Sequence, residues 1–297
     1  MNGGIRVLEA IQRGADFLAR KGVAAPRLQV ELLLAHLLGM PRMKLYLSFE
    51  RVLTAAEVDA LRPLVLRRGQ REPLQYIVGS TSFCGLELAL NRHVLIPRPE
   101  TELLAERAWT FLQKAAGTPS ALDVGAGSGC VAIVLAHHAP LAQIHATDSS
   151  AEALALARRN AQSNQVSDRL QFYQGDLLAA VPAGLRFDLI VSNPPYIPTA
   201  RIATLEAEVR DYEPRHALDG GADGLDFYRR LALEAGAFLR PAGRLMVELD
   251  DEGAEAARQI FERESWGVEA VEADYNRRPR ILIARPAARP HDGAGQT

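Results

Sequence analysis

The sequence has few cysteines, no long apolar run and almost no net charge, and each absence excludes a class of protein. The two cysteines, Cys84 and Cys130, form no C-x-x-C pattern and have no histidine set nearby. We therefore expect no disulfide framework, no metal site and a reducing, cytoplasmic compartment. No stretch approaches the ~20 apolar residues of a membrane-spanning helix, and the first residues lead into a mixed-charge helix instead of a signal-peptide core. The formal net charge of -2 over 297 residues argues against a polyanion-binding protein.

The first part of the chain differs from the rest in charge and in apolar pattern. Residues 1–80 hold 12 Lys and Arg against 7 Asp and Glu, a net charge of +5, which leaves -7 for the remainder. Helical periodicity predicts helices over residues 5–21, 26–38 and 42–49. Thr54 and Glu57 form a capping-box pattern before a fourth helix. We predict an all-helical domain over residues 1–78, interpreted as a substrate-docking domain, with a purely structural lid as the alternative.

The pattern changes after residue 78. From Phe83 onward apolar and other residues roughly alternate, which predicts a β-hairpin linker over residues 79–97. Pro99 then suits the first position of a helix, and the acidic residues that follow suit its first turn, near the positive helix end. This segment is either a helix start and nothing more, or a cover over a cofactor pocket with Arg98 or Thr101 reaching in.

Strands and helices alternate over residues 98–285, which predicts an α/β domain. The expected strands are 120–124, 143–147, 170–174, 187–191, 244–249, 268–273 and 280–284. The expected helices are 130–137, 151–163, 225–239 and 254–263. Residues 197–224 form a connection so long that a functional lid is expected. Residues 286–297, rich in Pro, Gly and Ala, are predicted to be a disordered tail.

A glycine loop follows the first of these strands. Gly125-Ala126-Gly127-Ser128-Gly129 allows a tight turn and close approach of a ligand to bare backbone, and a helix begins directly after it. The next strand ends in Asp148, which is placed to bind both hydroxyls of a ribose. Without a Gly-Lys-Ser/Thr sequence the loop is no Walker motif, so a nucleoside-bearing cofactor fits best. Asp176 also ends a strand and is equally compatible with an adenine contact or a simple turn.

A second strand end carries Asn193-Pro194-Pro195-Tyr196. Two prolines stop the preceding strand and stiffen the turn, which lies at the sheet edge where α/β proteins bind ligands. The turn offers one side-chain amide, carbonyl oxygens and one aromatic face, a set that suits a planar group carrying an NH2. The alternative is a simple turn followed by a core aromatic.

Taken together, these segments resemble the N5-glutamine methyltransferases of class I peptide-chain release factors, formerly called the HemK family. The resemblance covers nearly the whole chain. The glycine loop is general to methyltransferases, and Asn-Pro-Pro-Tyr is shared with amino-group nucleic-acid methyltransferases. Ile-Pro-Arg-Pro-Glu-Thr-Glu at 96–102 is more particular to the glutamine enzymes. Further support comes from Phe-Cys-Gly-Leu at 83–86 and from Glu213-Pro214-Arg215 through Gly224-Leu225-Asp226-Phe227-Tyr228.

The resemblance implies a Rossmann-like class I methyltransferase domain with a mixed seven-stranded sheet. It implies S-adenosylmethionine as the methyl donor, with S-adenosylhomocysteine as product. The residues expected to bind the donor are Thr101, Asp123, Gly125, Ala126, Gly127, Ser128, Gly129, Asp148, Asp176, Leu177 and Asn193. Those expected to hold the acceptor amide are Asn193, Pro194, Pro195 and Tyr196, with Asn193, Pro194 and Tyr196 as the catalytic set.

Two positions depart from the family pattern. A large aromatic often stands where this chain has Leu177, so the packing on adenine is expected to differ. The segment Glu248-Leu249-Asp250-Asp251-Glu252-Gly253 is also more acidic than expected after its strand.

The implied reaction is methylation of the glutamine side-chain nitrogen in the Gly-Gly-Gln motif of class I release factors, carried out by a monomer without membrane contact. A ribosomal-protein glutamine is the nearest alternative substrate. A nucleic-acid amino-group methyltransferase is a further alternative, although the chain has no dense Lys/Arg stripe, so a nucleic-acid substrate is not expected. A non-catalytic nucleoside-binding scaffold would have no need for Asn193.

Overall fold

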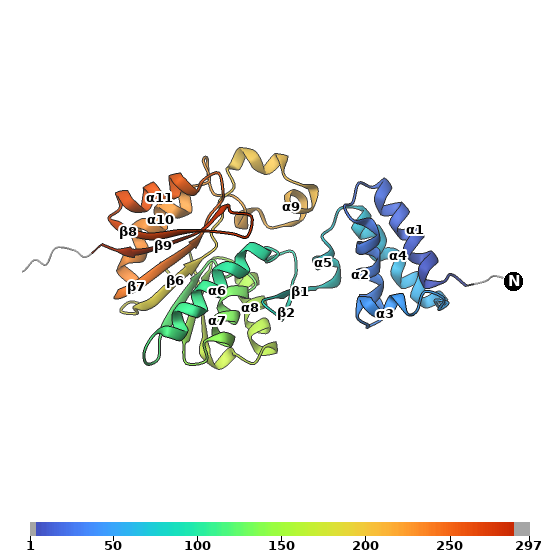
Figure 1. Cartoon of the computed structure of the whole chain (residues 1–297), viewed down its shortest axis with the longest axis horizontal. Coiled ribbons are helices and arrows are strands. Elements are labelled where there is room, and N and C mark those ends of the chain that lie inside the picture. The colour runs from blue at the N-terminus through green and yellow to red at the C-terminus, as the bar shows by residue number, and fades with distance from the viewer. Residues whose placement is uncertain (1–3, 288–297) are drawn as a thin grey trace, which may run out of the picture. The chain divides into compact units, whose positions relative to one another are not determined.

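The computed structural model describes residues 4–287, and the chain divides into two compact units. The first unit contains the residues up to Ser80 together with Glu206–Tyr212. The second contains Thr81–Leu205 and the residues from Glu213 onward. Figure 1 labels the helices and strands along the chain. No helix within the described residues has both the length and the apolar character needed to cross a bilayer.

The first unit is all-helical in its N-terminal part, as predicted. Its helices are α1 Val7–Arg20, α2 Pro26–Leu37, α3 Arg42–Tyr46, α4 Ala55–Gly69 and α5 Leu74–Val78. The capping box is confirmed, because the Thr54 hydroxyl accepts from the Glu57 N–H (3.2 Å) and the Glu57 carboxylate accepts from the Thr54 N–H (2.9 Å). Helix α5 is not predicted from the sequence, because a helix of five residues is too short to show helical periodicity.

One element of the first unit comes from far along the chain. Helix α9, Ala207–Tyr212, lies in the middle of the long connection that the sequence predicts as a lid. The Glu208 carboxylate accepts hydrogen bonds from Arg68 (2.8 Å) and Arg71 (2.7 and 2.5 Å). The Tyr212 hydroxyl donates to the Gln70 carbonyl (2.7 Å). The connection is therefore not one continuous loop, because its central turn of helix is part of the helical unit.

The second unit begins with the predicted hairpin. Strands β1 Ser80–Phe83 and β2 Leu86–Ala89 form a two-stranded sheet. Cys84 and Gly85 make the turn, both with positive φ (47° and 80°). The side chain of Asn160 accepts from the Ala89 N–H and donates to its carbonyl, so the end of β2 is fixed to the body of the unit.

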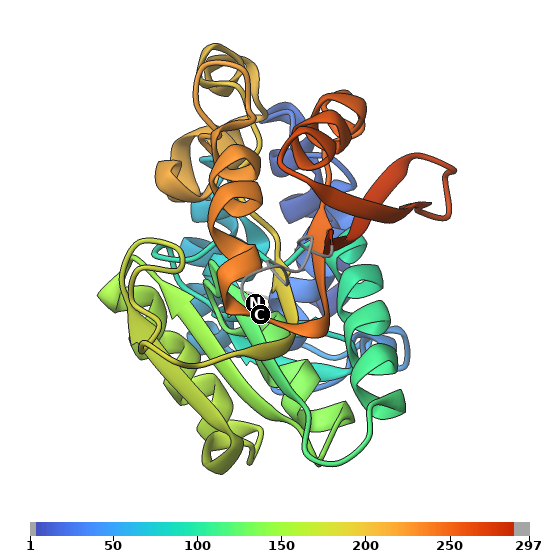
Figure 2. The ribbon, with the colours of Figure 1, turned by 90° about the vertical axis from the view of Figure 1, so that its left-hand side faces the viewer.

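A mixed seven-stranded sheet forms the centre of the second unit, as predicted. Its strands are β3 Ser120–Val124, β4 Gln143–Asp148, β5 Leu170–Gln174, β6 Phe187–Ser192, β7 Leu239–Glu248, β8 Trp266–Ala273 and β9 Pro279–Pro286. The strand order is β5-β4-β3-β6-β7-β9-β8. Strands β3 to β7 run parallel, and β9 is antiparallel to both of its neighbours. Figure 2 shows the β8–β9 hairpin at the edge of the sheet.

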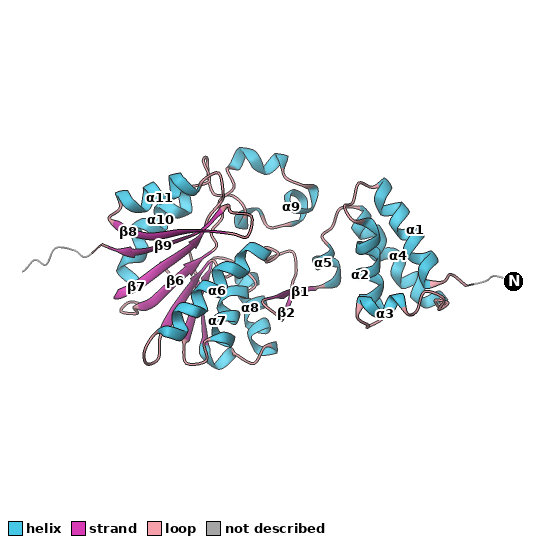
Figure 3. Ribbon diagram, in the orientation of Figure 1, coloured by secondary structure: helices cyan, strands magenta, loops and turns pink. Residues whose placement is uncertain are grey.

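Helices cover both faces of this sheet (Figure 3). They are α6 Pro99–Lys114, α7 Cys130–His138, α8 Ala151–Ser163, α10 Asp226–Glu234 and α11 Ala254–Arg263. Alternate residues of each strand face opposite sides, so Ala121 packs with α6 and α7 while Leu122 packs with α10 and α11. Burial on both faces explains why the central strands read as continuous apolar runs.

Some predicted boundaries were wrong. Residues 240–243 were expected to connect a helix to a strand, but they belong to β7, which begins at Leu239. Helix α10 ends at Glu234, and a 3-10 turn, Ala235–Phe238, completes the expected helical stretch. Of the predicted disordered tail, Pro286 ends β9, and residues 288–297 lie outside the described residues.

Candidate functional site

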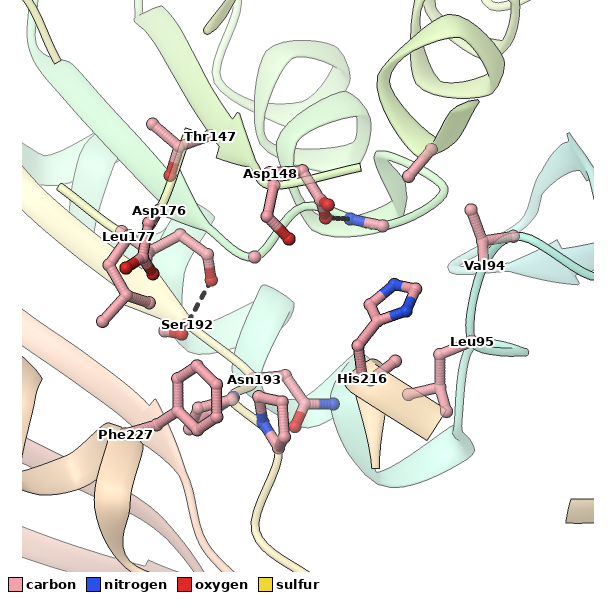
Figure 4. Close-up of a pocket in the computed structure, with 18 of the residues that line it drawn as sticks. Val94, Leu95, Thr147, Asp148, Asp176, Leu177, Ser192, Asn193, His216 and Phe227 are labelled. Carbon is pink, nitrogen blue, oxygen red and sulfur yellow. Dashed lines mark hydrogen bonds between the residues drawn. The ribbon is translucent and has the colours of Figure 1, made fainter. Parts of the chain in front are cut away.

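The two predicted loops lie side by side at the point where the strand order reverses. Strand β3 has β4 on one side and β6 on the other, so the chain continues in opposite directions from this pair. Ligands of open α/β sheets bind at such a switch point, outside the carboxyl ends of the strands. The structure has a cavity there, and Figure 4 shows the labelled side chains around it. Its lining includes Gly125, Gly127, Asp148, Asp176, Leu177, Asn193, Pro194, Pro195, His216 and Phe227.

The glycine loop leaves its backbone bare toward this cavity. Gly125 (φ +81°) and Gly127 (φ +55°) adopt the left-handed region, and a Cβ added at either would meet no atom within 4 Å. Gly129 (φ +81°) is different, because an added Cβ would lie 3.0 Å from the Ala157 Cβ. The first two glycines therefore keep space open, whereas Gly129 allows the close approach of α8 to the start of α7.

Asp148 is held rigidly at the end of β4. Its carboxylate accepts from the Gly127 N–H (2.8 Å) and from the Ser150 N–H (2.9 Å). The first bond ties the aspartate to the glycine loop, and Figure 4 shows it at the cavity wall. A carboxylate has about four acceptor positions. Two positions therefore remain for a ligand with two hydroxyl groups.

Asp123 lies beneath the loop, where it is 2% exposed and accepts from the Ala132 N–H (3.0 Å). Burial raises its pKa to about 7, against the lowering by that bond, and the charge of Asp148 raises it further. Asp123 lines a smaller cavity next to the first, together with Thr101, Ser128 and Asn193. The buried Ser128 hydroxyl has no hydrogen-bond partner within the described part of the chain.

Asp176 is less free than the sequence suggests. Its two carboxylate oxygens accept from the two terminal nitrogens of Arg230 (2.9 and 3.0 Å). Leu177, with φ +49°, is buried next to it on the cavity wall. Phe227 lines the same cavity, so an aromatic side chain is supplied from α10 and not from the position after the acidic residue.

The acceptor turn presents an oriented amide. The Asn193 Nδ2 donates one of its two hydrogens to the Thr101 Oγ1 (3.0 Å), which orients the amide, and Oδ1 is available as an acceptor for a ligand. Thr101 is 2% exposed in the first turn of α6, and Pro99 occupies the predicted first position of that helix. The Ser192 hydroxyl donates to the Val124 carbonyl (2.7 Å), which joins the ends of β6 and β3. Thr101 thus lies at the site, in agreement with the alternative in which this segment covers a cofactor pocket and not with a helix start alone.

Arg98 does not line either cavity but fixes a neighbouring segment. Its guanidinium donates to the Glu213 carboxylate (2.8 Å), whose side chain is 1% exposed. The Ile96 N–H donates to the same carboxylate (3.4 Å). Burial raises the pKa of Glu213, although Arg98 opposes that rise. Three residues after Glu213 the chain places His216 on the cavity wall.

Tyr196 is separated from the other predicted site residues. It lines a different cavity, with Pro198, Tyr228 and Asp250, and packs against the apolar core around α10 and α11. Burial raises the pKa of its hydroxyl, and the charge of Glu248 raises it further. Within the described residues, the structure thus groups Asn193, Pro194 and Pro195 at the donor-side cavity and leaves Tyr196 behind the turn.

His216 and Phe227 were not named as site residues from the sequence. His216 lies in the long connection, residues 197–224, and Phe227 follows directly after it. Their positions depend on the path by which this segment returns to the sheet. The one available signal was the stretch Gly224 through Tyr228, whose aromatics follow a glycine-rich turn.

Two family models match this chain. The PrmC N-terminal domain matches residues 9–79, and the methyltransferase small domain matches residues 101–208.

Related proteins extend the match over nearly the whole chain. A release factor glutamine methyltransferase of Geobacter sulfurreducens is 49% identical over 248 residues, covering 83% of this chain and 85% of that protein. One of Chlorobaculum tepidum is 45% identical over 283 residues, covering 93% of this chain and 96% of that protein. Among solved structures, a methyltransferase of Pyrococcus furiosus has a TM-score of 0.51 at 21% identity, covering 69% of this chain and 91% of that one. That likeness shows a shared fold.

Proposed function

This chain belongs to the release factor glutamine methyltransferase family, and we propose that it transfers a methyl group from S-adenosylmethionine to a glutamine side-chain nitrogen (N5). The proposed glutamine is that of the Gly-Gly-Gln motif in class I peptide-chain release factors. The reaction would take place in the cytoplasm, which suits the two free cysteines, Cys84 and Cys130. The observation that carries the proposal is the amide of Asn193, oriented by Thr101 beside a cavity that fits a nucleoside-bearing donor.

The residues around the larger cavity fit such a donor. Bare backbone at Gly125 and Gly127 leaves room for it, and the buried Thr147 hydroxyl on the cavity wall has no hydrogen-bond partner within residues 4–287. Asp148 would accept from the ribose hydroxyls with its two remaining positions. Leu177 and Phe227 would provide the apolar walls of the adenine site. Phe227 would thus take the place of the aromatic side chain that is absent at position 177.

The smaller cavity fits the amino-acid part of the donor. Asp123 would face its ammonium group, and the opposite charge would favour the ionised carboxylate that burial disfavours. The Ser128 hydroxyl is available as a further polar contact. When bound, the donor supplies a methyl group on a positively charged sulfur.

The acceptor amide would be held by oxygen atoms alone. The Asn193 Oδ1 and the Pro194 carbonyl would each accept one N–H of the substrate NH2. An amide nitrogen is a poor nucleophile, and fixing it in line with the methyl group removes several kcal/mol of the barrier through positioning. The same oxygens stabilise the positive charge that develops on nitrogen. Tyr196 would support the turn from behind, as its place in the apolar core indicates.

The helical unit is proposed to dock the release factor. It contains residues 1–78 of the predicted docking domain, and its basic balance suits an acidic partner surface. Residues 79–97 would act as the linker, residues 98–285 as the methyltransferase domain.

The test combines substrate choice with one variant. The protein is incubated with a donor carrying a labelled methyl group and, separately, a class I release factor, ribosomal proteins or DNA, and labelled peptides are mapped. Label is expected on the glutamine of the release factor's Gly-Gly-Gln loop. Label on another protein or on DNA would refute this function and identify the substrate instead.

The variant Asn193→Ala is expected to abolish transfer while donor affinity stays within about tenfold, a window of 1.4 kcal/mol. Calorimetric titration of the donor separates the two effects. Full activity of this variant would remove the proposed role of the acceptor turn.

A further inference from the structure

Glu248 is a buried carboxyl group that the proposed reaction does not yet use. It ends β7, next to β6, whose last residue, Ser192, precedes the acceptor amide. The residue is 1% exposed, and neither of its carboxylate oxygens has a hydrogen-bond partner within residues 4–287. Burying a carboxylate without a hydrogen-bond partner costs free energy, so a carboxyl group in this environment beside the acceptor turn is a candidate for a functional role.

Several groups act on Glu248 from the elements packed around it. Burial raises its pKa to about 7, and the nearby Thr101 hydroxyl is the group that lowers it most. Among the charged side chains, Arg280 and Arg98 lower the pKa and Glu100 raises it.

The remaining neighbours do not neutralise the carboxyl group. The terminal nitrogens of Arg280 pair with Asp274 (3.3 Å) and donate to the Leu249 carbonyl (3.0 Å), and its buried Nε has no hydrogen-bond partner within residues 4–287. The tyrosines that face Glu248 are Tyr196 and Tyr228, and Tyr228 donates to the Glu248 backbone carbonyl (2.9 Å), not to its carboxylate. Of the groups that act on Glu248, Thr101 is the one that also hydrogen-bonds to Asn193, so it is the group through which Glu248 can act on the site.

We propose that Glu248 is a positioning residue that, through the Thr101 hydroxyl, determines which side of the Asn193 amide faces the acceptor. Asn193 Nδ2 already donates to Thr101 Oγ1 at 3.0 Å. Because the hydroxyl has a single hydrogen, accepting from Asn193 leaves that hydrogen to point to another acceptor, and the Glu248 carboxylate provides one. This inference rests on the proposed function, in which Asn193 must present an oxygen to the substrate NH2.

The direction of this hydrogen-bond chain depends on the proton of Glu248. The ionised carboxylate can only accept, so Thr101 donates to it and accepts from Asn193 Nδ2, and Oδ1 faces the acceptor. The protonated acid donates to Thr101, which can then donate to Asn193 Oδ1 after a flip of the amide. The flipped amide presents N–H to a substrate N–H, which is a mismatch of two donors. Only the ionised form therefore supports methyl transfer.

A measurement without substrate tests the coupling itself. The side-chain 15N amide signals of Asn193, assigned by their loss in Asn193→Ala, are followed between pH 5.5 and pH 8.5 by NMR. We expect a chemical-shift titration with a midpoint near 7 in the wild type and in Thr101→Ser, and none in Glu248→Gln or Thr101→Val. Asp123→Asn is the matched control, because the pKa of Asp123 is also about 7 and Asp123 lines the smaller cavity together with Thr101 and Asn193. A titration that persists in Glu248→Gln, or that disappears in Asp123→Asn, overturns the proposal.

Kinetics provide the second measurement. The rate of transfer to the release factor at saturating donor should fall about tenfold per pH unit below 7 in the wild type, while Glu248→Gln, which cannot titrate, should have a flat profile. Thr101→Ser should keep the rate within threefold, and Thr101→Val should lose at least tenfold with donor affinity unchanged. A wild-type acidic limb in Glu248→Gln refutes the role of Glu248. Absence of any transfer by the wild type, with the NMR titration intact, refutes the proposed function instead.

Discussion

Removal of the Glu208 carboxylate should release α9 from the helical unit. This helix spans six residues, too few to be stable alone. One carboxylate makes three of its hydrogen bonds to the unit, accepting from Arg68 and from two nitrogens of Arg71, and the Tyr212 hydroxyl adds one to the Gln70 carbonyl. Although partial burial acts to raise the pKa of Glu208, the hydrogen bonds from Arg71 and Arg68 bring it below its ordinary value. The carboxylate is therefore ionised at neutral pH.

The size of the effect follows from burial. The side chain of Arg68 is 7% exposed and that of Glu208 is 19% exposed. Removing one partner of a buried ion pair costs about 3–5 kcal/mol. Arg68 keeps its hydrogen bonds to Gln29 (2.9 Å) and to the Glu72 carbonyl (3.2 Å), and Glu208 is partly solvated. We therefore expect Glu208→Ala to lower the free energy of opening α9 by about 2–3 kcal/mol, at or below that range.

Hydrogen exchange measures this opening directly. The amides of 207–212 should lose protection by about 30- to 150-fold in Glu208→Ala, because 1.4 kcal/mol corresponds to a factor of ten. Asp211→Ala is the matched control on the same helix, since the side chains of the Arg210–Asp211 pair are 41% and 48% exposed and water screens such a pair. Protection within threefold of the wild type in Glu208→Ala, or an equal loss in Asp211→Ala, would refute the reasoning.

Three further predictions concern the second unit. The pKa of Asp123 is raised from 3.8 to about 7, so the folded state binds the carboxyl proton more tightly than the unfolded state does. The free energy of unfolding should therefore fall as the pH rises from about 4 to about 7. Asp123→Asn, which cannot titrate, should show a smaller fall in urea titrations over the same pH range. Gly129→Ala, strained at φ +81° and 3.0 Å from Ala157, should destabilise by about 2–4 kcal/mol, whereas Gly85→Ala, with open space at φ +80°, should cost only about 1–2 kcal/mol in the same assay. Asn160→Ala removes three hydrogen bonds from a 1% exposed side chain and should cost about 2–4 kcal/mol in thermal unfolding.

Features written in short stretches of sequence were predictable. The capping box at Thr54, the proline at the start of α6 and the glycine loop each depend on a few adjacent residues, and the structure has all three. The position of Asp148 and Asn193 at the same edge of the sheet followed from the alternation of strands and helices, because parallel strands bring their carboxyl ends to one edge.

Features that depend on distant residues were not predictable. Arg68 reads as an ordinary basic residue in the last turn of a helix, and its partner Glu208 lies 140 positions later. The direction of Tyr196 is likewise fixed by the core around α10, not by the two prolines before it. The engagement of Asp176 by Arg230 requires α10 to return to the same edge of the sheet. Local propensity has no information about such pairings.

The distribution of charge around Asn193 explains why an amide serves the proposed acceptor better than a carboxylate. Asp123 and Glu248 are both buried, and burial raises the pKa of each to about 7. Neither forms a hydrogen bond to Asn193, whose Nδ2 is bound by the neutral Thr101 hydroxyl. Negative charge is thus available to balance a cationic donor, yet it is kept one group away from the substrate NH2. A carboxylate at position 193 would add a third buried charge, which the described surroundings could neutralise only by protonation, and a protonated acid would offer a donor where an acceptor is needed.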